Sequence, residues 1–446
     1  MNIQMATVLE RIHEFNRFGS ILGLGRMNIL LSKLGNPHSE LDVIHVAGTN
    51  GKGSVCKFLE EGLSACGYKM GLYTSPFIEK FNERIRLGGQ DIADEELEVY
   101  GSRVLAAAED MVAEGLQSPT EFEVVTAIAF LYFKEKGADI VVLEVGLGGS
   151  GDSTNVVPKP LAAVICSISY DHINVLGGTL PEIAAEKAGI IKPQAPVISN
   201  VPQHEAAKVI AKTAYEKDSK LYDVSKIDFC IFEETPLSQK VSMDIYGTDY
   251  SDVEISMVGE HQGENLKTAL ATIEVLRKER KIKVERTKLY AGLKRAIQPG
   301  RFEVLEAAAA KQKENGEAAK KPLLIIDGAH NEAGACALQE TMQKYFAGKK
   351  ILLITGMLAD KRVEAILKHF VKITEDIIAT EPDNPRKLEV GQLEQYLRDM
   401  GIRPKTAADA EESVKLAREL GKDYDVVIFA GSLYLIGAVR RMIRDE

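Results

Sequence analysis

The sequence has few cysteines, and their spacing excludes several kinds of site. Only five occur among 446 residues, with no CxxC pair and no other spacing typical of metal ligands. An odd number also does not suit a disulfide framework. The cysteines therefore indicate a protein of a reducing compartment; they are Cys56, Cys66, Cys166, Cys230 and Cys336.

Long apolar segments are missing as well. No apolar run reaches about 18 residues, the length that a membrane-spanning helix requires. Residues 1–6 have neither the basic region nor the apolar core of a secretory signal. We therefore expect a cytoplasmic protein that does not interact with membranes.

An excess of positive charge is the third missing feature. Lys and Arg total 55 against 65 Asp and Glu, which gives a net charge of −10. Such a chain has no general basic field to hold a polyanion, so nucleic acid is excluded as a partner. A phosphate-bearing ligand would have to be bound by a local arrangement of backbone N–H groups, basic side chains and a metal ion.

The apolar residues that are present alternate between strand-length runs and helical patterns. With 446 residues, 45% hydrophobic and 27% charged, the chain has ordinary globular composition and the length of two domains. Short apolar runs separated by helices predict parallel strands with crossover connections, hence an α/β fold. The expected strands of the first part are 41–47, 140–145, 161–168 and 196–200, and the expected helices are 55–67, 180–191 and 204–215.

The same alternation returns after residue 320, which predicts a second α/β domain with strands at 323–327, 350–355, 376–380 and 425–430. A long helix is expected over 264–297, and the Gln298-Pro299-Gly300 sequence that follows is typical of a helix stop and a turn. We therefore expect domains at 1–298 and 299–446. Residues 229–258 predict antiparallel strands attached to the first domain, and the polar segment 307–321 predicts an exposed connection without a function.

A glycine-rich loop carries the strongest local signal. The sequence Gly48-Thr49-Asn50-Gly51-Lys52-Gly53-Ser54 lies between an expected strand and an expected helix, as phosphate binding requires. Lys52 supplies a positive charge and Ser54 a hydroxyl for magnesium. The spacing departs from GxxxxGK[ST], because Val46 replaces the first glycine and Gly53 precedes the serine. An ordinary glycine-rich turn is the alternative, and we favour a nucleoside triphosphate site.

Three further residues each allow two interpretations. Glu144 ends an apolar strand, where it is either a magnesium ligand or a solvated charge. His172 follows another strand and is either a ligand or a hydrogen-bonded structural group. Lys187 lies among Ala, Gly and Ile on an expected helix, as either a surface residue with an apolar stem or a neutral, reactive amine.

Nine sequence motifs are spread along the whole chain. They are GTNGKGS, SPF-x4-NERI at 75–85, TEFE at 120–123, LEVGLGG at 143–149, DH-x14-K with AEKAGI at 185–190, GEHQGEN at 259–265, PGRFE at 299–303, DGAHN at 327–331 and GSLYLIG at 431–437. In sequence and in order they resemble the motifs of folylpolyglutamate synthases and bifunctional dihydrofolate synthases, which belong to the Mur ligase superfamily.

The resemblance implies an ATP-dependent amide ligase with a central P-loop domain, built on a parallel sheet, and a smaller Rossmann-like C-terminal domain. In the implied reaction, a carboxylate of folate or dihydropteroate attacks the γ-phosphate of ATP. The amine of L-glutamate then displaces phosphate from the acyl phosphate. The expected protein is a monomer that uses two Mg²⁺ ions.

The resemblance also implies roles for individual residues. Lys52, Lys187 and His330 are implied as catalytic, and Lys187 as a carbamylated lysine whose new carboxylate binds a second magnesium. An unmodified lysine would repel the metal. The implied metal ligands are Ser54, Ser75, Glu144, His172 and Lys187.

For ATP, the resemblance adds residues from both domains to the loop, so that ATP would lie at the domain interface and catalysis would require closure. Asn265 and Arg301 are implied as adenine and phosphate contacts, Asp327 as a ribose contact, and His330 as a γ-phosphate contact. The complete set of expected nucleotide-binding residues is Thr49, Asn50, Gly51, Lys52, Gly53, Ser54, Asn265, Arg301 and Asp327.

The pterin-contacting segments of the family match residues 120–123 and the segment after Gly149. One departure from the family occurs there: Ser150-Gly151 replaces the usual Arg-Leu, which removes a guanidinium and adds flexibility. Phe77 also stands where many members have His. The expected substrate-binding residues are Thr120, Glu121, Phe122, Glu123, Gly151, Asp152 and Ser153.

Two alternatives remain at this stage. One is another Mur-type ligase acting on a UDP-sugar peptide, against which the NERI and TEFE segments argue. The other is a nucleotide-binding regulator without ligase activity, suggested by the altered loop at Ser150 and Gly151.

Overall fold

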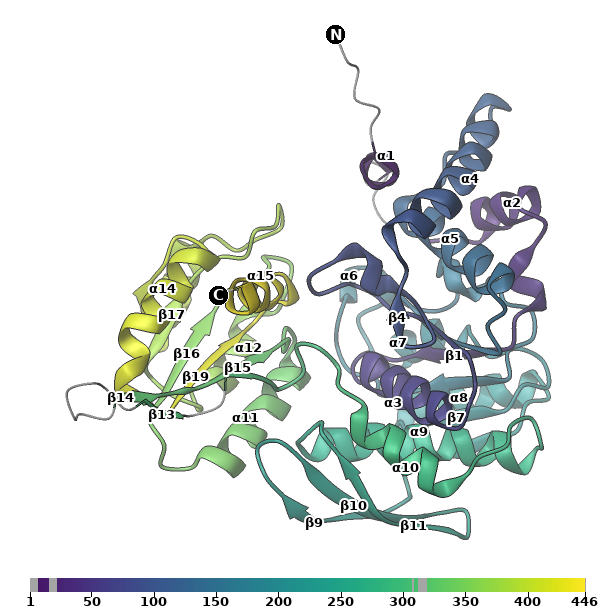
Figure 1. Ribbon diagram of the computed structural model, residues 1–446. Helices are drawn as coiled ribbons and strands as arrows, with labels where there is room; N and C mark the ends of the chain where they lie inside the picture. The colour runs from purple at the N-terminus through teal and green to yellow at the C-terminus, as the bar shows by residue number, and fades with distance from the viewer. Residues whose placement is uncertain (1–6, 16–21, 307–308, 312–318, 446) are drawn as a thin grey trace. The chain divides into compact units, whose positions relative to one another are not determined.

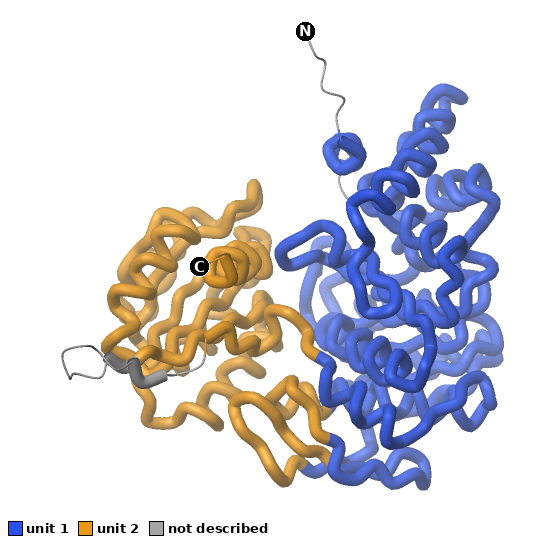
Figure 2. Tube along the Cα trace, in the orientation of Figure 1, with its two compact units in different colours: residues 1–230, 242–253, 264–296 blue, residues 231–241, 254–263, 297–446 orange. Residues whose placement is uncertain are grey.

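The computed structural model describes residues 7–15, 22–306, 309–311 and 319–445. The chain divides into two compact units (Figure 2). The first comprises residues 1–230, 242–253 and 264–296, and the second 231–241, 254–263 and 297–446. In both units strands alternate with helices along the chain (Figure 1), so the predicted α/β class is confirmed.

An eight-stranded sheet organises the first unit, in the order β4-β3-β2-β5-β1-β6-β7-β8. The neighbouring strands in the series β2-β5-β1-β6-β7-β8 pair in parallel. At one edge of the sheet, β3 pairs antiparallel with β2 and with β4. The central strands are buried on both faces, which explains their continuous apolar sequence. The strands are β1 (Val43–Ala47), β2 (Met70–Tyr73), β3 (Ile85–Leu87), β4 (Gln90–Asp91), β5 (Ile140–Glu144), β6 (Ala162–Ile165), β7 (Val197–Ser199) and β8 (Leu221–Asp223).

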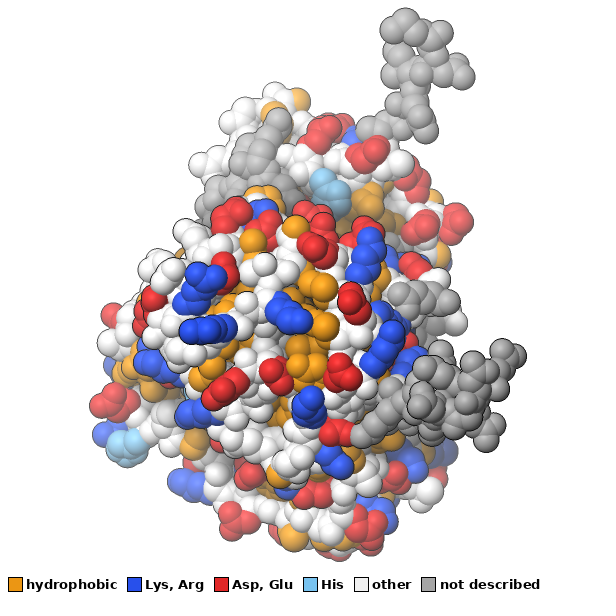
Figure 3. All heavy atoms as spheres, turned by 90° about the vertical axis from the view of Figure 1, so that its left-hand side faces the viewer, with side chains coloured by type: hydrophobic (Ala, Val, Ile, Leu, Met, Phe, Trp, Pro, Cys, Tyr) orange, Lys and Arg blue, Asp and Glu red, His pale blue; other side chains and the backbone are white. Residues whose placement is uncertain are grey.

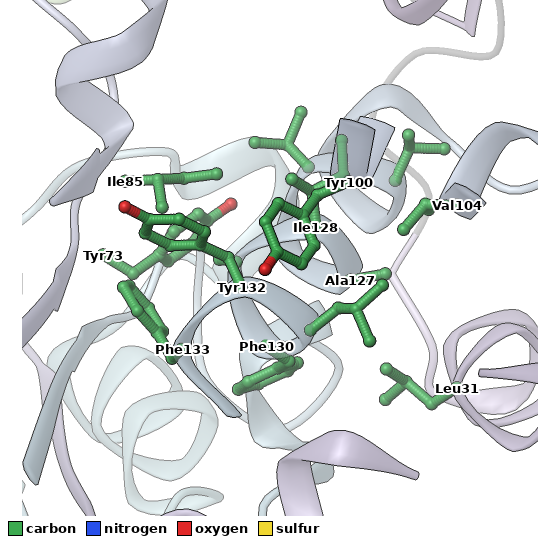
Figure 4. Packing of buried hydrophobic residues seen from close by; sticks show 14 of the residues in the cluster. Leu31, Tyr73, Ile85, Tyr100, Val104, Ala127, Ile128, Phe130, Tyr132 and Phe133 are labelled. Carbon is green, nitrogen blue, oxygen red and sulfur yellow. The ribbon is translucent and has the colours of Figure 1, made fainter. Parts of the chain in front are cut away.

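Helices connect these strands and supply the main core of the unit. Helix α5 (Glu121–Glu135) is buried on nearly all sides, and its aromatic residues pack with Tyr73 and Tyr100 (Figure 4). The sequence starts this helix with a capping box, in which the Thr120 hydroxyl accepts from Glu123 N and the Glu123 carboxylate accepts from Thr120 N. The other helices are α1 (Val8–Glu14), α2 (Gly25–Lys33), α3 (Lys52–Ala65), α4 (Asp94–Ala113), α6 (Ile173–Leu176), α7 (Leu180–Ala188) and α8 (His204–Glu216).

The long helix expected over 264–297 is two helices, so that prediction is wrong. Helix α9 (Glu260–Lys278) ends before Arg280, whose φ of 57° lies in the left-handed region, and α10 (Arg286–Arg295) begins after a short connection. A left-handed residue cannot continue a right-handed helix.

The strands predicted within 229–258 form one three-stranded sheet, in the order β11-β10-β9. Its strands are β9 (Phe229–Glu234), β10 (Gln239–Ile245) and β11 (Thr248–Ile255), and the connections between neighbours are short enough to be hairpins. The sequence predicted that this segment is attached to the first domain. In the structure, residues 231–241 and 254–263 belong instead to the second unit, and only residues 229–230 and 242–253 belong to the first.

A six-stranded sheet organises the second unit, in the order β12-β15-β19-β16-β17-β18. All its pairs are parallel except β12 with β15. Alternate residues of β15 and β16 enter two separate apolar clusters, so both faces of the sheet are covered. The strands are β12 (Glu303–Glu306), β15 (Leu323–Asp327), β16 (Ile351–Thr355), β17 (Ile377–Ala379), β18 (Lys405–Thr406) and β19 (Val426–Ala430), and the helices are α11 (Glu332–Phe346), α12 (Val363–Phe370), α13 (Val390–Asp399), α14 (Ala410–Leu420) and α15 (Leu433–Asp445).

The connection predicted at 307–321 contains an antiparallel strand pair, β13 (Ala309–Lys311) with β14 (Ala319–Lys321). The rest of the predicted connection, residues 307–308 and 312–318, lies outside the described residues. None of the helices that the structure describes combines the length and the apolar character needed to cross a bilayer. On the face drawn in Figure 3, acidic and basic side chains are interspersed.

Candidate active site

The glycine-rich loop follows β1, whose neighbours β5 and β6 place it at the middle of the carboxyl edge of the sheet. Ligands of open α/β sheets bind at this edge. The segment after β6 holds the loop: Thr49 N donates to Ser167 O at 2.7 Å, and Asn50 N donates to Ser167 Oγ at 3.1 Å. Lys52, Gly53 and Ser54 then form the first turn of α3. The predicted strand, loop and helix are therefore present in the predicted order.

Asn265 lies directly against this loop. Gly51, with φ of 84°, would place an added Cβ atom 2.2 Å from Asn265 Oδ1. The structure thus brings together two residues, far apart in the sequence, for which the resemblance implied a nucleotide-binding role. The close approach also explains why position 51 is a glycine.

Gly51→Ala is expected to weaken ATP binding about tenfold, because an L-residue at this φ is strained by about 1–2 kcal/mol and the new methyl group displaces Asn265. Calorimetric titration with ADP measures the effect. Gly67→Ala is the matched control, since Gly67 also has positive φ, 99°, but its Cβ would meet no atom within 4 Å. Equal losses in the two variants would show that backbone strain alone is responsible.

Two lysines converge on one carbonyl group of the loop. Lys52 Nζ donates to Gly48 O at 3.1 Å and to Thr49 O at 3.2 Å. Lys187, on α7, donates to Gly48 O at 2.9 Å and is only 4% exposed. Burial lowers the pKa of Lys187 to about 7, and the positive charge of Lys52 acts in the same direction. The surface interpretation of Lys187 is therefore wrong, and the interpretation as an amine that deprotonates near neutral pH is favoured.

Glu144 and Ser75 form a second part of the site. Glu144 ends β5 and is 5% exposed, which excludes the solvated-charge interpretation, and its Oε2 accepts from Ser75 N at 3.3 Å. Burial raises the pKa of Cys56, and the Glu144 carboxylate raises it further while Lys52 lowers it. Glu144 therefore acts electrostatically on the first turns of α3, where Ser54 is buried.

His172 follows β6 and precedes α6, with φ of 49°. Its ring is 39% exposed, and its Nε2 lies 3.9 Å from Asp171 Oδ1. Within the ranges that the structure describes, no three His, Cys, Asp or Glu side chains gather closely enough to hold a metal ion. A cation at this site would therefore depend on hydroxyl and phosphate oxygens in addition to Glu144.

The TEFE segment, Thr120 to Glu123, starts α5 beside a buried arginine that the sequence analysis did not single out. Arg84, from the NERI motif, is 7% exposed, and its guanidinium lies 5.5 Å from the centres of the Phe81 and Phe122 rings. Its Nη1 lies 3.6 Å from Glu121 Oε1. Across the described chain, Arg84 Nε and Glu123 Oε1 are buried without a hydrogen-bond partner. Buried polar atoms without a partner are uncommon in folded proteins, and a polar ligand would be one explanation for this pair.

The loop at 147–155 is organised by Asp152, which accepts from Leu147 N at 2.9 Å and from Thr154 Oγ1 at 2.5 Å. Burial raises the pKa of Asp152. Thr154 in turn contacts Nε2 of His45, a fully buried residue of β1, at 2.9 Å. His45 was not among the predicted site residues, although a histidine within an apolar strand is a signal that the sequence shows. Ser153 is also buried.

The departure at Ser150-Gly151 lies where the loop meets α7. Ser150 is exposed, and its N and Oγ donate to Glu186 O at 2.9 Å and 3.1 Å. An added Cβ at Gly151 would lie 3.0 Å from the Leu22 side chain. The loop therefore packs on the helix that carries Lys187 without any help from the missing arginine and leucine.

The second unit groups the remaining predicted residues. Asp327 ends β15 and is 8% exposed, and its two oxygens accept from Phe302 N and Ala329 N, each at 2.8 Å. Burial raises the pKa of Asp327, and the charge of Arg301 opposes this shift. His330 Nδ1 lies 2.8 Å from Gly328 O. Arg301, Asp327 and His330 are therefore neighbours, and both Asp327 oxygens are already engaged by the backbone.

The fold and the site define a Mur-type ligase. Residues 46–273 match the Mur ligase middle domain, and residues 300–433 match the Mur ligase, glutamate ligase domain. The chain is 37% identical, over 97% of both sequences, to the dihydrofolate synthase/folylpolyglutamate synthase of Bacillus subtilis. It belongs to the dihydrofolate synthase and folylpolyglutamate synthase family.

Solved structures of proteins from this family have the same fold as this chain. The Mycobacterium tuberculosis folylpolyglutamate synthase complexed with ADP and AMPPCP matches with a TM-score of 0.88 and 28% identity, over 98% of both chains. Escherichia coli FolC in complex with DHPP and ADP matches with a TM-score of 0.86 and 28% identity, over 99% of this chain and 98% of FolC. The agreement extends over both units of the chain.

Proposed function

We propose that this protein is an ATP-dependent ligase that joins L-glutamate to a folate carboxylate, and that it also accepts dihydropteroate. The main support is the convergence of Lys52 and Lys187 on Gly48 of a phosphate-binding loop, in a chain of this family. The loop N–H groups and Lys52 would hold the ATP phosphates. The carboxylate of the acceptor would then approach the γ-phosphate in a site where positive charge offsets the repulsion between two anions.

The donor set fits magnesium. Glu144 provides a buried carboxylate, and Ser54 and Ser75 provide hydroxyl groups, all hard oxygen ligands. Bound Mg²⁺ would neutralise phosphate oxygens and stabilise the charge that develops on them. We propose that Ser54, Ser75, Glu144 and His172 hold the ion, with the ATP phosphates completing its coordination.

Lys187 is proposed to be carbamylated. A neutral amine reacts with CO₂ to give a carbamate and a proton, and a group that titrates near pH 7 is substantially neutral at physiological pH. The carbamate would replace a positive charge by a carboxylate oxygen pair, which fits a second magnesium ion. The nucleotide roles of Asn265, Arg301, Asp327 and His330 are proposed as the family resemblance implies them. The cytoplasmic location and the monomeric state stay predictions.

The decisive experiment compares ADP release in the presence of glutamate with tetrahydrofolate and with dihydropteroate, and identifies the product by mass spectrometry. We expect a glutamyl amide product from each acceptor. Stimulation by neither acceptor would reject the proposed function, and stimulation by a UDP-sugar peptide would identify another Mur-type ligase. Nucleotide binding without any amide product would instead indicate a regulator.

Ser150→Arg is expected to lower the KM for folate about fivefold, the equivalent of about 1 kcal/mol, by restoring a guanidinium near the acceptor site. The exposed position of Ser150 allows the longer side chain to extend without burial of its charge. Ser150→Gln, which adds length without charge, is the matched control. An unchanged KM in Ser150→Arg would show that the missing arginine does not weaken folate binding.

A further inference from the structure

The backbone around Arg301 is held in an unusual conformation. Arg301 N donates to Gln298 O at 3.2 Å, and the residues on either side of Arg301 have positive φ, 68° at Gly300 and 46° at Phe302. For phenylalanine this conformation is strained by about 1–2 kcal/mol. Strain of this kind persists only where the surrounding structure enforces it, and it clusters at functional sites.

Two carboxylates enforce the conformation, one on each side of Arg301. Asp327 accepts from Phe302 N at 2.8 Å, and Glu303 accepts from Gly300 N at 2.8 Å. The Phe302 ring is also buried, with its centre 6.3 Å from that of Phe346. Both N–H groups that flank Arg301 in the sequence are therefore fixed by charged acceptors, which form stronger hydrogen bonds than neutral ones.

Glu303 is itself held by a residue that lies 137 positions later, in the C-terminal helix α15. Arg440 Nε lies 3.0 Å from Glu303 Oε1 and 2.9 Å from Oε2, and Arg440 Nη2 lies 2.9 Å from Oε1. The two side chains are 8% and 10% exposed. A buried pair with this geometry fixes the carboxylate in one orientation, because its fork-shaped donor matches both oxygens.

Arg301 closes a turn that begins at Gln298, and its side chain faces the segment after β15. An added Cβ at Gly328 would lie 3.2 Å from Arg301 Nη1, and Gly328 N donates to Gly300 O at 2.7 Å. Within the described part of the chain, no hydrogen bond or ion pair engages the Arg301 guanidinium. The backbone of Arg301 is thus fixed by several contacts, while its charged end is available to a ligand.

We propose that Glu303 and Arg440 are positioning residues, which act on the nucleotide through Arg301. The pair fixes Gly300 N inside the turn that runs from Gln298 to Arg301. The fixed turn sets the backbone of Arg301, and this backbone directs the guanidinium toward a phosphate. This inference rests on the proposed function, in which Arg301 contacts a phosphate of ATP.

Strand β12, which begins at Glu303 and ends at Glu306, carries a second ion pair that provides a matched comparison. Glu306 of β12 pairs with Arg418 of α14, with Nη1 to Oε2 at 2.6 Å and Nη2 to Oε1 at 2.8 Å. This pair also joins β12 to a helix, and the basic partners of Glu306 in the described part of the chain are Arg418 and Lys321, which lie outside the turn at 298–302. A purely structural role for Glu303 and Arg440 would make the two pairs equivalent.

The test measures ADP binding by calorimetry, KM values for ATP and folate, and melting temperatures. We expect Glu303→Gln and Arg440→Lys to raise the Kd for ADP and the KM for ATP about tenfold, with the KM for folate within twofold of wild type. Arg440→Lys retains the buried positive charge, so it remains informative if Glu303→Gln does not fold. Glu306→Gln is expected to lower the melting temperature while leaving ADP binding within twofold.

A double-mutant cycle separates positioning from stability. If Glu303 acts through Arg301, adding Glu303→Gln to Arg301→Ala should not weaken ADP binding further. Additive losses, or unchanged ADP binding in both Glu303→Gln and Arg440→Lys, would overturn the inference. Wild-type protein that binds ADP but forms no glutamyl product would reject the proposed function alone. Wild-type protein that does not bind ADP would overturn both.

Discussion

Lys187→Ala is expected to reduce glutamate ligation by about a thousandfold or more, the upper end of the loss seen when one electrostatic group is removed from an active site. The side chain is 4% exposed and donates to Gly48 O at 2.9 Å, so it lies against the loop proposed to hold the phosphates. Alanine removes the amine that would form the carbamate. Turnover of ATP with folate and glutamate, measured at saturating magnesium, gives the size of the loss.

Three controls connect the loss to the carbamate. Lys187→Arg keeps a positive charge but cannot form a carbamate at neutral pH, so it should be as inactive as the alanine variant. Acetate or formate should partly restore Lys187→Ala by placing a carboxylate in the vacated space. In the wild type, ¹³C-bicarbonate labelling should increase as the pH rises through about 7, because only the neutral amine reacts. Full activity of Lys187→Ala would refute the role.

The sequence predicts the elements whose signals are local. The strand, glycine-rich loop and helix at residues 43–65 are contiguous in the chain, and the second unit has strands at all four predicted positions. These segments need only an apolar run and a turn signal to be found. The helix break at Arg280 has no such signal, because the sequence there contains neither glycine nor proline.

Contacts between distant segments were beyond this kind of prediction. His45 meets Thr154 across 109 positions, and Arg440 meets Glu303 across 137, so no local pattern could pair them. The burial of Lys187 also depends on a distant contact. Its neighbours in the sequence are compatible with either a surface or a buried lysine, and Lys187 is buried because α7 packs against the glycine-rich loop. Asp327 was predicted from a motif that implies a ribose contact. The structure adds a second role that the motif does not reveal, because the Asp327 carboxylate accepts hydrogen bonds from Phe302 N and Ala329 N.

Lys52→Ala is expected to lower kcat/KM by about thirtyfold to a thousandfold, or about 2–4 kcal/mol of transition-state stabilisation. Lys52 lies in the first turn of α3 and donates to the carbonyls of Gly48 and Thr49, so the loop itself orients the ammonium group. Its charge would act on the oxygens that gain negative charge as the acceptor carboxylate attacks. Most of the loss should therefore appear in kcat, with a smaller rise in the KM for ATP.

Lys57→Met is the matched control, because Lys57 lies on the same helix and pairs with Glu60 at 2.6 Å and with Glu61 at 3.0 Å. Removing this buried cation should lower the melting temperature, because Glu60 would stay buried and Arg86 would be its one remaining basic partner among the described residues. It should leave kcat/KM within a few fold. If Lys52→Ala and Lys57→Met lost the same amount of kcat/KM, the effect of Lys52→Ala would be explained by damage to helix α3. A loss confined to the KM for ATP would mean that Lys52 binds the nucleotide equally before and during the reaction, and that the charge needed in the transition state comes from elsewhere in the site.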